Sequence, residues 1–265
     1  MSWCAASEDP AGGDAHLRLA LLAARYELAG DAVRQLETFL DLLVGDPHAP
    51  TAVREPVGAV DDHFADALVA LEVVELRSAL AIADIGSGGG VPGLVLAIAM
   101  PRADVYLVES SGRKCEFQTR AVAACALANA HVIHARAESW RWGLARFDAV
   151  TARAVAPPAV VAEYAAPLLR IGGTLIAWRG RRDGVAEAHA VRAAAHLGLR
   201  VVEPVPVQPY PGAERRHLQL MSKVKQTPSG FPRREGLAAR RPLGSDRRSG
   251  RGGESGARSS DRTRR

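Results

Sequence analysis

The sequence Ile82-Ala83-Asp84-Ile85-Gly86-Ser87-Gly88-Gly89-Gly90-Val91-Pro92-Gly93 holds five glycines within eight residues. The apolar residues 80–85 predict a buried strand, and residues 92–100 predict a helix. Because glycine lacks a Cβ atom, such a loop turns sharply and lets its backbone approach a ligand closely. The free N–H groups and partial positive charge at the start of the helix favour a nucleotide-like molecule. Strand, glycine loop and helix together predict a cofactor site.

Asp84 distinguishes between the cofactors that this kind of loop binds. Glycines at 88, 90 and 93 formally match the dinucleotide pattern G-x-G-x-x-G, which keeps a nicotinamide-dependent oxidoreductase as one alternative. A carboxylate two residues before Gly86 would repel a pyrophosphate, but it suits the ammonium and sulfonium groups of S-adenosylmethionine. The pattern Asp-x-Gly-x-Gly-x-Gly resembles motif I of the class I methyltransferases, which implies S-adenosylmethionine as the cofactor.

Alternating strand and helix patterns begin at about residue 79 and continue to residue 224. We expect strands over 80–85, 104–109, 132–135, 147–152 and 174–178, and a closing pair near 201–202 and 218–221. Such alternation predicts a parallel sheet with helices on both faces. The expected fold class is therefore α/β, a Rossmann-like class I methyltransferase fold with a mostly parallel seven-stranded sheet.

The segments on either side of this domain differ from it in composition. Residues 15–78 have apolar residues at helical spacing and predict a helical cap, interrupted by a Pro-rich loop over 46–60. Residues 1–14 are small and polar, and residues 244–265 are rich in Arg, Ser and Gly, so we expect both to be disordered. A tail segment over 225–243 lies between the domain and the second of these.

Positive charge is concentrated at the C-terminal end of the chain. The 265 residues carry a formal net charge of +5; residues 222–265 hold 13 basic and 4 acidic residues, a net of +9, and residues 1–221 hold 21 and 25, a net of −4. This asymmetry predicts a polyanionic partner. The three cysteines have no metal-ligand spacing, and no apolar run reaches the roughly 18 residues of a membrane span, so we expect a cytoplasmic protein without a metal.

Polar residues follow the predicted strands at the edge where parallel sheets bind ligands. Glu109 ends the second strand, where a carboxylate accepts hydrogen bonds from a ribose diol. Ala137 and Glu138 follow the third strand, at the place of an adenine edge. Arg153 ends the fourth strand and Arg179 the fifth, and two more arginines follow at 181 and 182. These cations suit a cofactor carboxylate or nucleic-acid phosphate.

The sequence contains no nucleophile–base motif such as G-x-S-x-G, H-E-x-x-H or C-x-x-C. Methyl transfer to a ring nitrogen with a free lone pair requires no general base, because positioning and electrostatics are enough. A non-catalytic RNA-binding protein that kept the fold is a second alternative, and the intact glycine loop argues against it.

Four further segments carry a resemblance to one known family. Residues 63–68 (HFADAL) are similar to its H-x-x-D-S-L, residues 108–117 (VESSGRKCEF) to its second-strand segment, and residues 147–154 (FDAVTARA) to its F-D-x-V-x-S-R-A. Residues 227–236 (TPSGFPRREG), with Pro242 and Leu243, are similar to its T-P-x-x-Y-P-R-x-x-G…P-L. With the Pro-Gly at the end of the glycine loop, the chain resembles the RsmG (GidB) family of 16S rRNA guanine-N7 methyltransferases over about residues 17–243.

The resemblance implies a substrate and completes the set of expected site residues. It implies methylation at N7 of one guanine of 16S rRNA in the small ribosomal subunit, by a protein that we expect to be a monomer. The expected catalytic residues are Arg153 and Arg179. The expected RNA contacts are His63, Asp66, Arg181, Arg182, Arg233 and Arg234. The expected cofactor residues are Asp84, Gly86, Ser87, Gly88, Gly90, Pro92, Gly93, Glu109, Ala137, Glu138 and Arg153.

The sequence departs from the family pattern at three places. The family's Trp-Asn after the second helix is missing near residues 45–47, and its Lys-Gly after the fifth strand is Arg179-Gly180 here. An extra arginine stands in residues 214–218 (ERRHL), a segment that the family writes as Glu-Arg-His-Leu. These departures affect the expected RNA contacts more than the cofactor loop.

Overall fold

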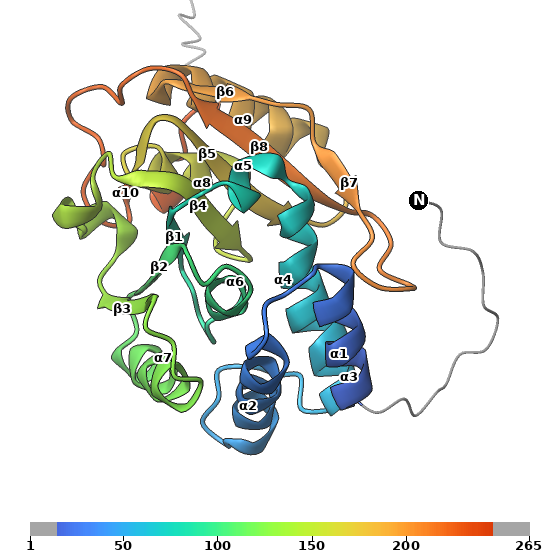
Figure 1. Cartoon of the computed structure of the whole chain (residues 1–265). Helices are drawn as coiled ribbons and strands as arrows, with labels where there is room; N and C mark the ends of the chain where they lie inside the picture. Colours follow the sequence, from blue (N-terminus) through green and yellow to red (C-terminus); the bar gives the residue numbers. More distant parts are fainter. Residues whose placement is uncertain (1–14, 246–265) are drawn as a thin grey trace, which may run out of the picture.

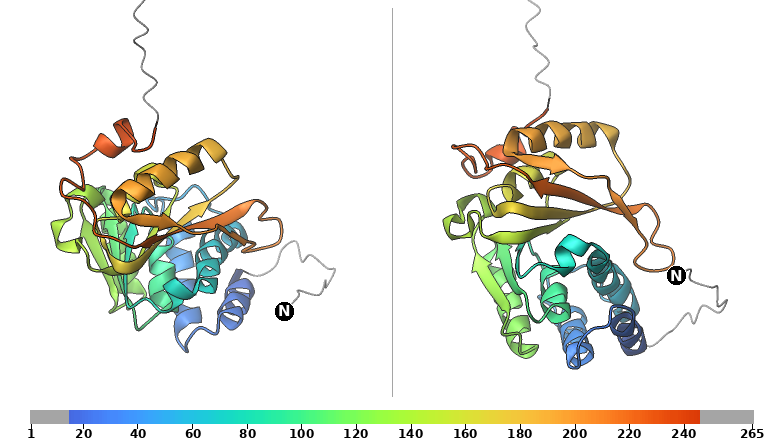
Figure 2. Two further views of the ribbon diagram at one scale, coloured as in Figure 1. Left: turned by 90° about the horizontal axis from the view of Figure 1, so that it is seen from above. Right: turned by 45° about the horizontal axis from the view of Figure 1, so that its top comes forward.

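The structure, a computed structural model, describes residues 15–245. Disorder was predicted for residues 1–14 and 244–265; apart from residues 244 and 245, these segments lie outside the described residues. Within them, alternating strands and helices form one sheet with helices on both faces, as Figures 1 and 2 show. The fold class predicted from the sequence is confirmed.

The sheet has eight strands in the order β3-β2-β1-β4-β5-β8-β6, with β7 paired to β8 outside this path. The first five strands run parallel, and β8 runs antiparallel to β5, β6 and β7. The expected closing pair exists, with Val201 opposite Met221, but the expected count of seven was one too low because the short β7 adds a strand. The strands are β1 (Ala81–Ile85), β2 (Asp104–Glu109), β3 (Ala130–His134), β4 (Phe147–Arg153), β5 (Leu169–Arg179), β6 (Leu199–Val201), β7 (Val205–Val207) and β8 (Arg216–Lys223).

The order of the strands fixes the position of the site. The chain reverses its direction of travel across the sheet between β1 and β4, which are neighbours. In open α/β sheets, ligands bind at such a switch point, beyond the carboxyl ends of the strands. The connecting helices are α6 (Gly93–Ala99), α7 (Gly112–Ala124), α8 (Pro158–Ala165) and α9 (Gly184–Leu197), and two 3₁₀ turns, η3 (Ala137–Ser139) and η4 (Arg141–Gly143), connect β3 to β4.

The N-terminal segment is helical and covers the same face of the sheet as α6. Its elements are α1 (Ala15–Arg25), α2 (Ala32–Gly45), α3 (Pro56–Ala59), the π-helical turn η1 (Val60–Ala65), α4 (Asp66–Leu68), the 3₁₀ turn η2 (Val69–Glu72) and α5 (Val74–Arg77). Figure 2 shows these helices and α9 on opposite sides of the sheet. The loop predicted over residues 46–60 was wrong at its end, because Glu55 caps α3 by accepting hydrogen bonds from the N–H groups of Val57 and Gly58.

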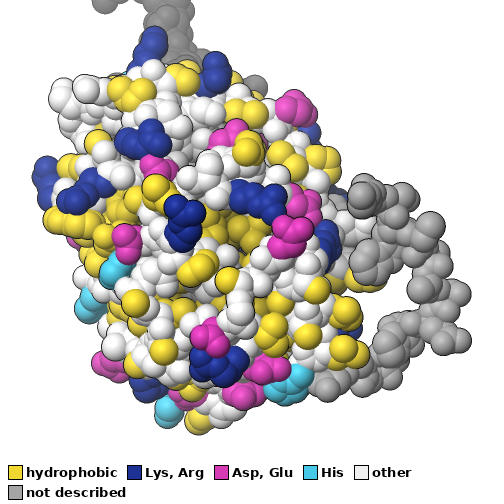
Figure 3. Space-filling view, in the orientation of Figure 1, with side chains coloured by type: hydrophobic (Ala, Val, Ile, Leu, Met, Phe, Trp, Pro, Cys, Tyr) yellow, Lys and Arg dark blue, Asp and Glu magenta, His cyan; other side chains and the backbone are white. Residues whose placement is uncertain are grey.

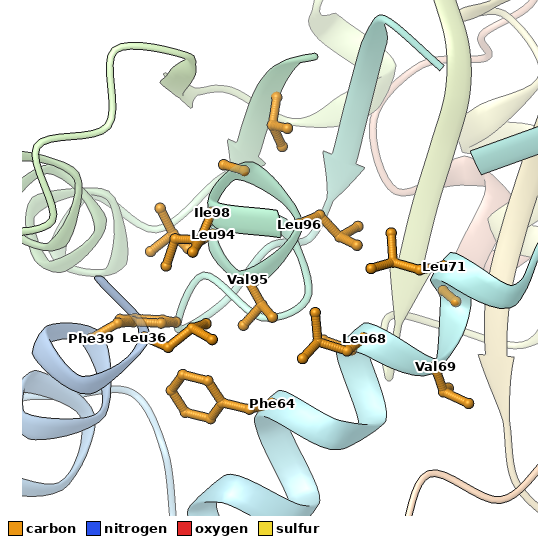
Figure 4. Packing of buried hydrophobic residues seen from close by; sticks show 14 of the residues in the cluster. Leu36, Phe39, Phe64, Leu68, Val69, Leu71, Leu94, Val95, Leu96 and Ile98 are labelled. Atoms are coloured by element: carbon orange, nitrogen blue, oxygen red, sulfur yellow. The ribbon is translucent and has the colours of Figure 1, made fainter. Parts of the chain in front are cut away.

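The N-terminal helices pack on the helix that follows the glycine loop. Phe39 of α2 and Phe64 of η1 have ring centroids 5.6 Å apart, and both side chains are fully buried. Figure 4 shows them converging with Leu68 on Val95 and its neighbours in α6. Burying a large apolar side chain contributes roughly 1.5–3 kcal/mol. This shared core therefore joins the helical cap to the glycine loop.

The chain after β8 folds back over the opposite face. We call residues 225–245 the C-terminal strap; it includes α10 (Leu237–Arg240), which lies against α8. Its start is fixed at the end of α9, where the N–H groups of Val224 and Lys225 donate to the carbonyl of Gly198. The strap then runs along α8 toward η3, which brings it close to the predicted adenine position.

Candidate functional site

The glycine loop at the end of β1 is a tight turn that leaves little room for side chains at two of its positions. Gly86, Gly88 and Gly90 have φ angles of +64°, +57° and +87°, a region that residues with side chains rarely adopt. A Cβ atom at position 86 would lie 2.9 Å from Val155, and one at position 90 would lie 2.4 Å from Leu94. At Gly88 the nearest atom would be 3.8 Å away. A side chain would therefore clash at positions 86 and 90 but not at position 88, and Gly88 is partly exposed.

Asp84 lies on the protein side of the glycine loop and is hydrogen-bonded to it. Its side chain is fully buried, and its two carboxylate oxygens accept hydrogen bonds from the Thr151 hydroxyl at 2.8 Å and from the Gly93 N–H at 3.0 Å. Burial raises the pKa of Asp84 to about 7, although both hydrogen bonds act in the opposite direction. The structure therefore places Asp84 behind the loop, so that its influence on a ligand passes through Gly93 and α6.

Glu109 holds the other side of the loop. Its Oε2 accepts a hydrogen bond from the Gly88 N–H at 3.0 Å, and its Oε1 accepts from the N–H groups of Ser110 and Ser111 at 2.8 and 2.9 Å. The Nζ of Lys114 lies 4.0 Å from Oε2. A carboxylate has about four acceptor positions, so Oε2 keeps one for a hydroxyl group of a ligand.

Arg153 at the end of β4 meets residues from the N-terminal cap. Its Nη1 donates to the Asp62 carbonyl at 2.7 Å and to the Asp66 carboxylate at 2.9 Å, and its Nη2 lies 3.3 Å from Nδ1 of His63. Arginine has no acceptor, so Nδ1 must accept, and Nε2 of His63 carries the proton that bonds Thr51 at 2.8 Å. Burial and the charge of Arg153 lower the pKa of His63, in agreement with a neutral ring. The structure brings Arg153, an expected catalytic residue, together with His63 and Asp66, which the sequence indicated as a pair of RNA contacts.

A second arginine, Arg216 of β8, completes this cluster. Its guanidinium donates to Asp66 at 2.9 Å, to Asp62 at 3.2 Å and to the hydroxyl of Tyr210 at 2.9 Å. Tyr210 in turn donates to Asp62. Asp62 and His63 lie in the π-helical turn η1, a rare backbone form that is frequent at functional sites. The cluster joins the cap, β4 and β8 at the carboxyl end of the sheet.

The arginines after β5 differ from one another. Arg179 is half-buried and donates to the Ala156 carbonyl at 3.3 Å, and burial lowers its pKa from the usual value. Arg182 is exposed and bonds Glu187 at 2.9 and 2.6 Å. Arg181 is exposed, and no hydrogen bond or ion pair to it was found among residues 15–245. In the space-filling view of Figure 3, Lys and Arg side chains border a central patch that contains hydrophobic ones.

The C-terminal strap reaches the predicted adenine position. The Gly236 N–H donates to Glu138 Oε1 at 3.1 Å, and Glu235 accepts from Ser139 and lies 3.3 Å from Nε of Arg136. Ala137 stands beside these contacts in η3. One carboxylate oxygen of Glu138 is thus already engaged by the Gly236 N–H.

Arg233 and Arg234 have different environments. The guanidinium of Arg233 forms two hydrogen bonds to Glu163, which is 1% exposed, and one to the Arg241 carbonyl at 2.9 Å. Arg234, its neighbour in sequence, is exposed. The structure gives Arg233 an internal partner and leaves Arg234 exposed. The RNA contacts expected from the sequence stay predictions for both residues.

Sequence reasoning missed several residues of the site. Thr151 is a hydroxyl residue in an otherwise apolar part of a strand, and its register opposite Asp84 comes only from the sheet. Gln118 is three residues from both Cys115 and Ala121, so it lies on the buried face of α7, which was the available sign. Nothing local marked Asp62 or Tyr210, because their partners are distant in the chain. Arg216 lies in residues 214–218, which the sequence marked only as a departure from the family pattern.

Comparison with known proteins identifies the family. Residues 32–209 match the profile of the family described as rRNA small subunit methyltransferase G. This chain belongs to that family. A ribosomal RNA small subunit methyltransferase G of Rubrobacter xylanophilus is 42% identical over 219 residues, which cover 78% of this chain and 82% of that protein. The protein of the same name from Chloroflexus aggregans is 42% identical over 215 residues, with coverages of 79% and 89%.

Among solved structures, an S-adenosylmethionine-dependent O-methyltransferase of Thermotoga maritima is similar with a TM-score of 0.48 at 17% identity, covering 62% of this chain and 66% of that one. The family assignment itself comes from the sequence matches. The profile match includes the glycine loop, Glu109 and Arg153, while residues after 209, among them the strap, lie beyond the family profile.

The described residues offer neither a metal site nor a membrane-spanning helix. Among residues 15–245, no group of three or more His, Cys, Asp or Glu side chains is arranged to hold a metal ion. In the same range, every helix is too short or too polar to cross a bilayer.

Proposed function

We propose that this chain is an S-adenosylmethionine-dependent methyltransferase that methylates N7 of one guanine in 16S rRNA. The observation that carries this proposal is the hydrogen bond between Glu109 and Gly88, within a chain of the rRNA small subunit methyltransferase G family. It places an acid with a spare acceptor position directly beside Gly88, the loop glycine at which an added Cβ atom would be least crowded. That is the arrangement that a ribose next to a backbone cradle requires.

The residues of the loop fit the proposed cofactor. The crowded positions 86 and 90 keep the backbone in place, and Gly88 offers an approach without a side chain. Gly86, Ser87, Gly88 and Gly93 would hold the amino-acid part, and Glu109 would accept from the ribose. Ala137 and Glu138 would border the adenine. Asp84 would act by fixing the Gly93 N–H and the start of α6.

The bound cofactor would supply an activated methyl group on a sulfonium. Guanine N7 has an in-plane lone pair, so the chain needs no base to remove a proton first. Its task is to align the acceptor and to neutralise the phosphates that come with it. Arg153 and Arg179, at the ends of the neighbouring strands β4 and β5, have the charge and the place for this task.

The RNA would lie over the carboxyl ends of the strands. The exposed side chains of Arg181 and Arg234 can contact phosphates, whereas Arg182 already forms an ion pair with Glu187. His63, neutral and held by Arg153 and Thr51, would face the substrate from the cap. Each phosphate contact would add to a salt-dependent affinity without base specificity.

The test is transfer of labelled methyl from S-adenosylmethionine to small ribosomal subunits that lack the modification. We expect label in 16S rRNA and one site of chemical cleavage at N7-methylguanosine. Label only in protein or DNA would contradict the proposal. Binding of a reduced nicotinamide cofactor, without binding of S-adenosylmethionine, would favour the oxidoreductase alternative.

A pair of variants localises the activity to the loop. We expect Glu109→Ala to abolish cofactor binding, because Gly88 loses its partner and the ribose its acceptor. Glu116→Ala changes an exposed acid on α7 and should bind as the wild type does. RNA binding by a wild-type protein that binds no cofactor would favour the non-catalytic alternative.

A further inference from the structure

Gln118 on α7 reaches into the glycine loop from the protein interior. Its side chain is fully buried, and its Nε2 donates to the Ser87 hydroxyl at 2.8 Å and to the Gly88 carbonyl at 2.8 Å. It lies one helical turn after Lys114, on the same side of α7. Within residues 15–245, the side-chain hydrogen bonds from the helix that follows β2 to the loop that follows β1 come from this one carboxamide.

Gly88 is consequently held at both of its polar groups. Glu109 accepts from its N–H at 3.0 Å, and Gln118 donates to its carbonyl at 2.8 Å. Gly88 has a φ angle of +57° and no Cβ atom, so without these two contacts its peptide planes would be free to rotate. Among the glycines of the loop, Gly88 is the one at which an added Cβ atom would be least crowded.

The same side chain carries an unfavourable feature. The Oε1 of Gln118 is buried and accepts no hydrogen bond within residues 15–245. A buried acceptor without a partner reduces stability, and an apolar residue of similar shape would avoid that loss. The neighbouring buried positions of α7 are apolar or weakly polar: Cys115, Phe117 and Ala121. Stability alone therefore does not explain a glutamine at this position.

We propose that Gln118 is a positioning residue that presets the Gly88 peptide for the cofactor. This inference rests on the proposed function, in which the loop binds S-adenosylmethionine. Gln118 itself lies beneath the loop and touches no ligand. Its two hydrogen bonds hold Ser87 and Gly88 in the conformation that the ligand requires. The loop is therefore ordered before the cofactor binds, and the cost of ordering it does not reduce the affinity.

The test compares cofactor affinity with thermal stability in Gln118→Leu. We expect S-adenosylmethionine to bind about tenfold more weakly by isothermal titration, which corresponds to about 1.4 kcal/mol. The Tm of the free protein should stay the same or rise, because the unpaired Oε1 is removed. At saturating cofactor, kcat should remain near the wild-type value while KM for the cofactor increases.

Control variants separate this role from a structural one. Gln35→Leu removes a carboxamide that donates to the Cys125 carbonyl at 3.0 Å, away from the loop, and should leave cofactor affinity unchanged. If Gln118→Leu does not fold, Gln118→Met keeps an unbranched side chain and serves the same comparison. Wild-type affinity in a folded Gln118 variant would overturn the inference, as would a fall in Tm that accounts for the loss of binding. Absence of cofactor binding in the wild type would instead overturn the proposed function.

Discussion

Asp66 in the N-terminal cap accepts a hydrogen bond from Arg153 at the end of β4 at 2.9 Å, across 87 residues of chain. The other oxygen of the same carboxylate accepts from Arg216 of β8 at 2.9 Å. Asp66 is 2% exposed, so one buried negative charge is shared by two guanidinium groups from two strands. The helical cap is therefore part of the site and sets the direction of Arg153.

Neutralising Asp66 should impair both stability and activity. We expect Asp66→Asn to lower the free energy of unfolding by about 3 kcal/mol, because two partly buried cations lose their shared partner. Arg153 would no longer be aligned, and kcat should fall by about 100-fold. Urea denaturation and methyl transfer to small subunits measure the two effects.

Asp61→Asn is the matched control for this prediction. Asp61 pairs with Arg18 at 3.0 Å, and both side chains are partly exposed. We expect a change below about 1 kcal/mol and normal activity. Wild-type kcat in Asp66→Asn would show that the other contacts of Arg153, to the Asp62 carbonyl and His63, are enough to position it.

The buried carboxyl of Asp84 should make stability depend on pH. Its pKa is about 7 in the folded protein, above the unfolded value of about 3.9, so the folded state binds the proton more tightly. This contribution to stability is complete below about pH 4 and is lost as the pH rises to about 7, with a slope of at most about 1.4 kcal/mol per pH unit.

Comparison with Asp84→Asn isolates that contribution. The Asp84→Asn variant does not titrate at this position. The unfolding free energy of the wild type minus that of the variant should therefore decrease from pH 5 to pH 7. His63 and His217 titrate in both proteins and cancel in the difference. A difference that is constant over this range would mean that Asp84 keeps an ordinary pKa.

Arg233 and Arg234 should separate folding from RNA binding. Arg233→Met removes the partner of buried Glu163, and we expect a loss of about 3 kcal/mol in unfolding free energy. Arg234→Met should change stability by less than about 0.5 kcal/mol. It should weaken rRNA binding and reduce the slope of log K against log salt by about 1.

Urea denaturation and filter binding at several salt concentrations measure these effects. A stable Arg233→Met protein with a reduced salt slope would restore the RNA contact that the sequence suggested for Arg233. The strap would then be a mobile arm and not a fixed part of the fold.

A variant at Gly93 tests whether the glycine loop tolerates a side chain, and a variant at Gly180 is its control. A Cβ atom at position 93 would lie 2.3 Å from Leu107 and 2.7 Å from Asp84, so Gly93→Ala should destabilise the protein by about 1–3 kcal/mol. It should also abolish binding of S-adenosylmethionine, which isothermal titration measures. Gly180→Ala, at the end of β5, meets no atom within 4 Å and should be neutral. Unchanged cofactor affinity in Gly93→Ala would contradict the placement of the site at this loop.

The sequence by itself determined the framework of the site. The strand, glycine loop and helix over residues 81–99 are local patterns, and so are Glu109 and Arg153 at the ends of apolar strands. Local hydrophobic period and glycine spacing specify these elements, because their physical causes act between near neighbours in the chain. Fold class, cofactor loop and family resemblance could therefore be predicted without coordinates.

Only the tertiary structure decided which partner each polar side chain has. Thr151 meets Asp84 through the register of β1 and β4, and Arg216 meets Asp66 across 150 residues. Arg233 and Arg234 are neighbours in the sequence, yet the fold of the strap pairs the first with buried Glu163 and leaves the second exposed. A charge becomes structural or functional according to its burial and its neighbours, and these depend on contacts between distant segments.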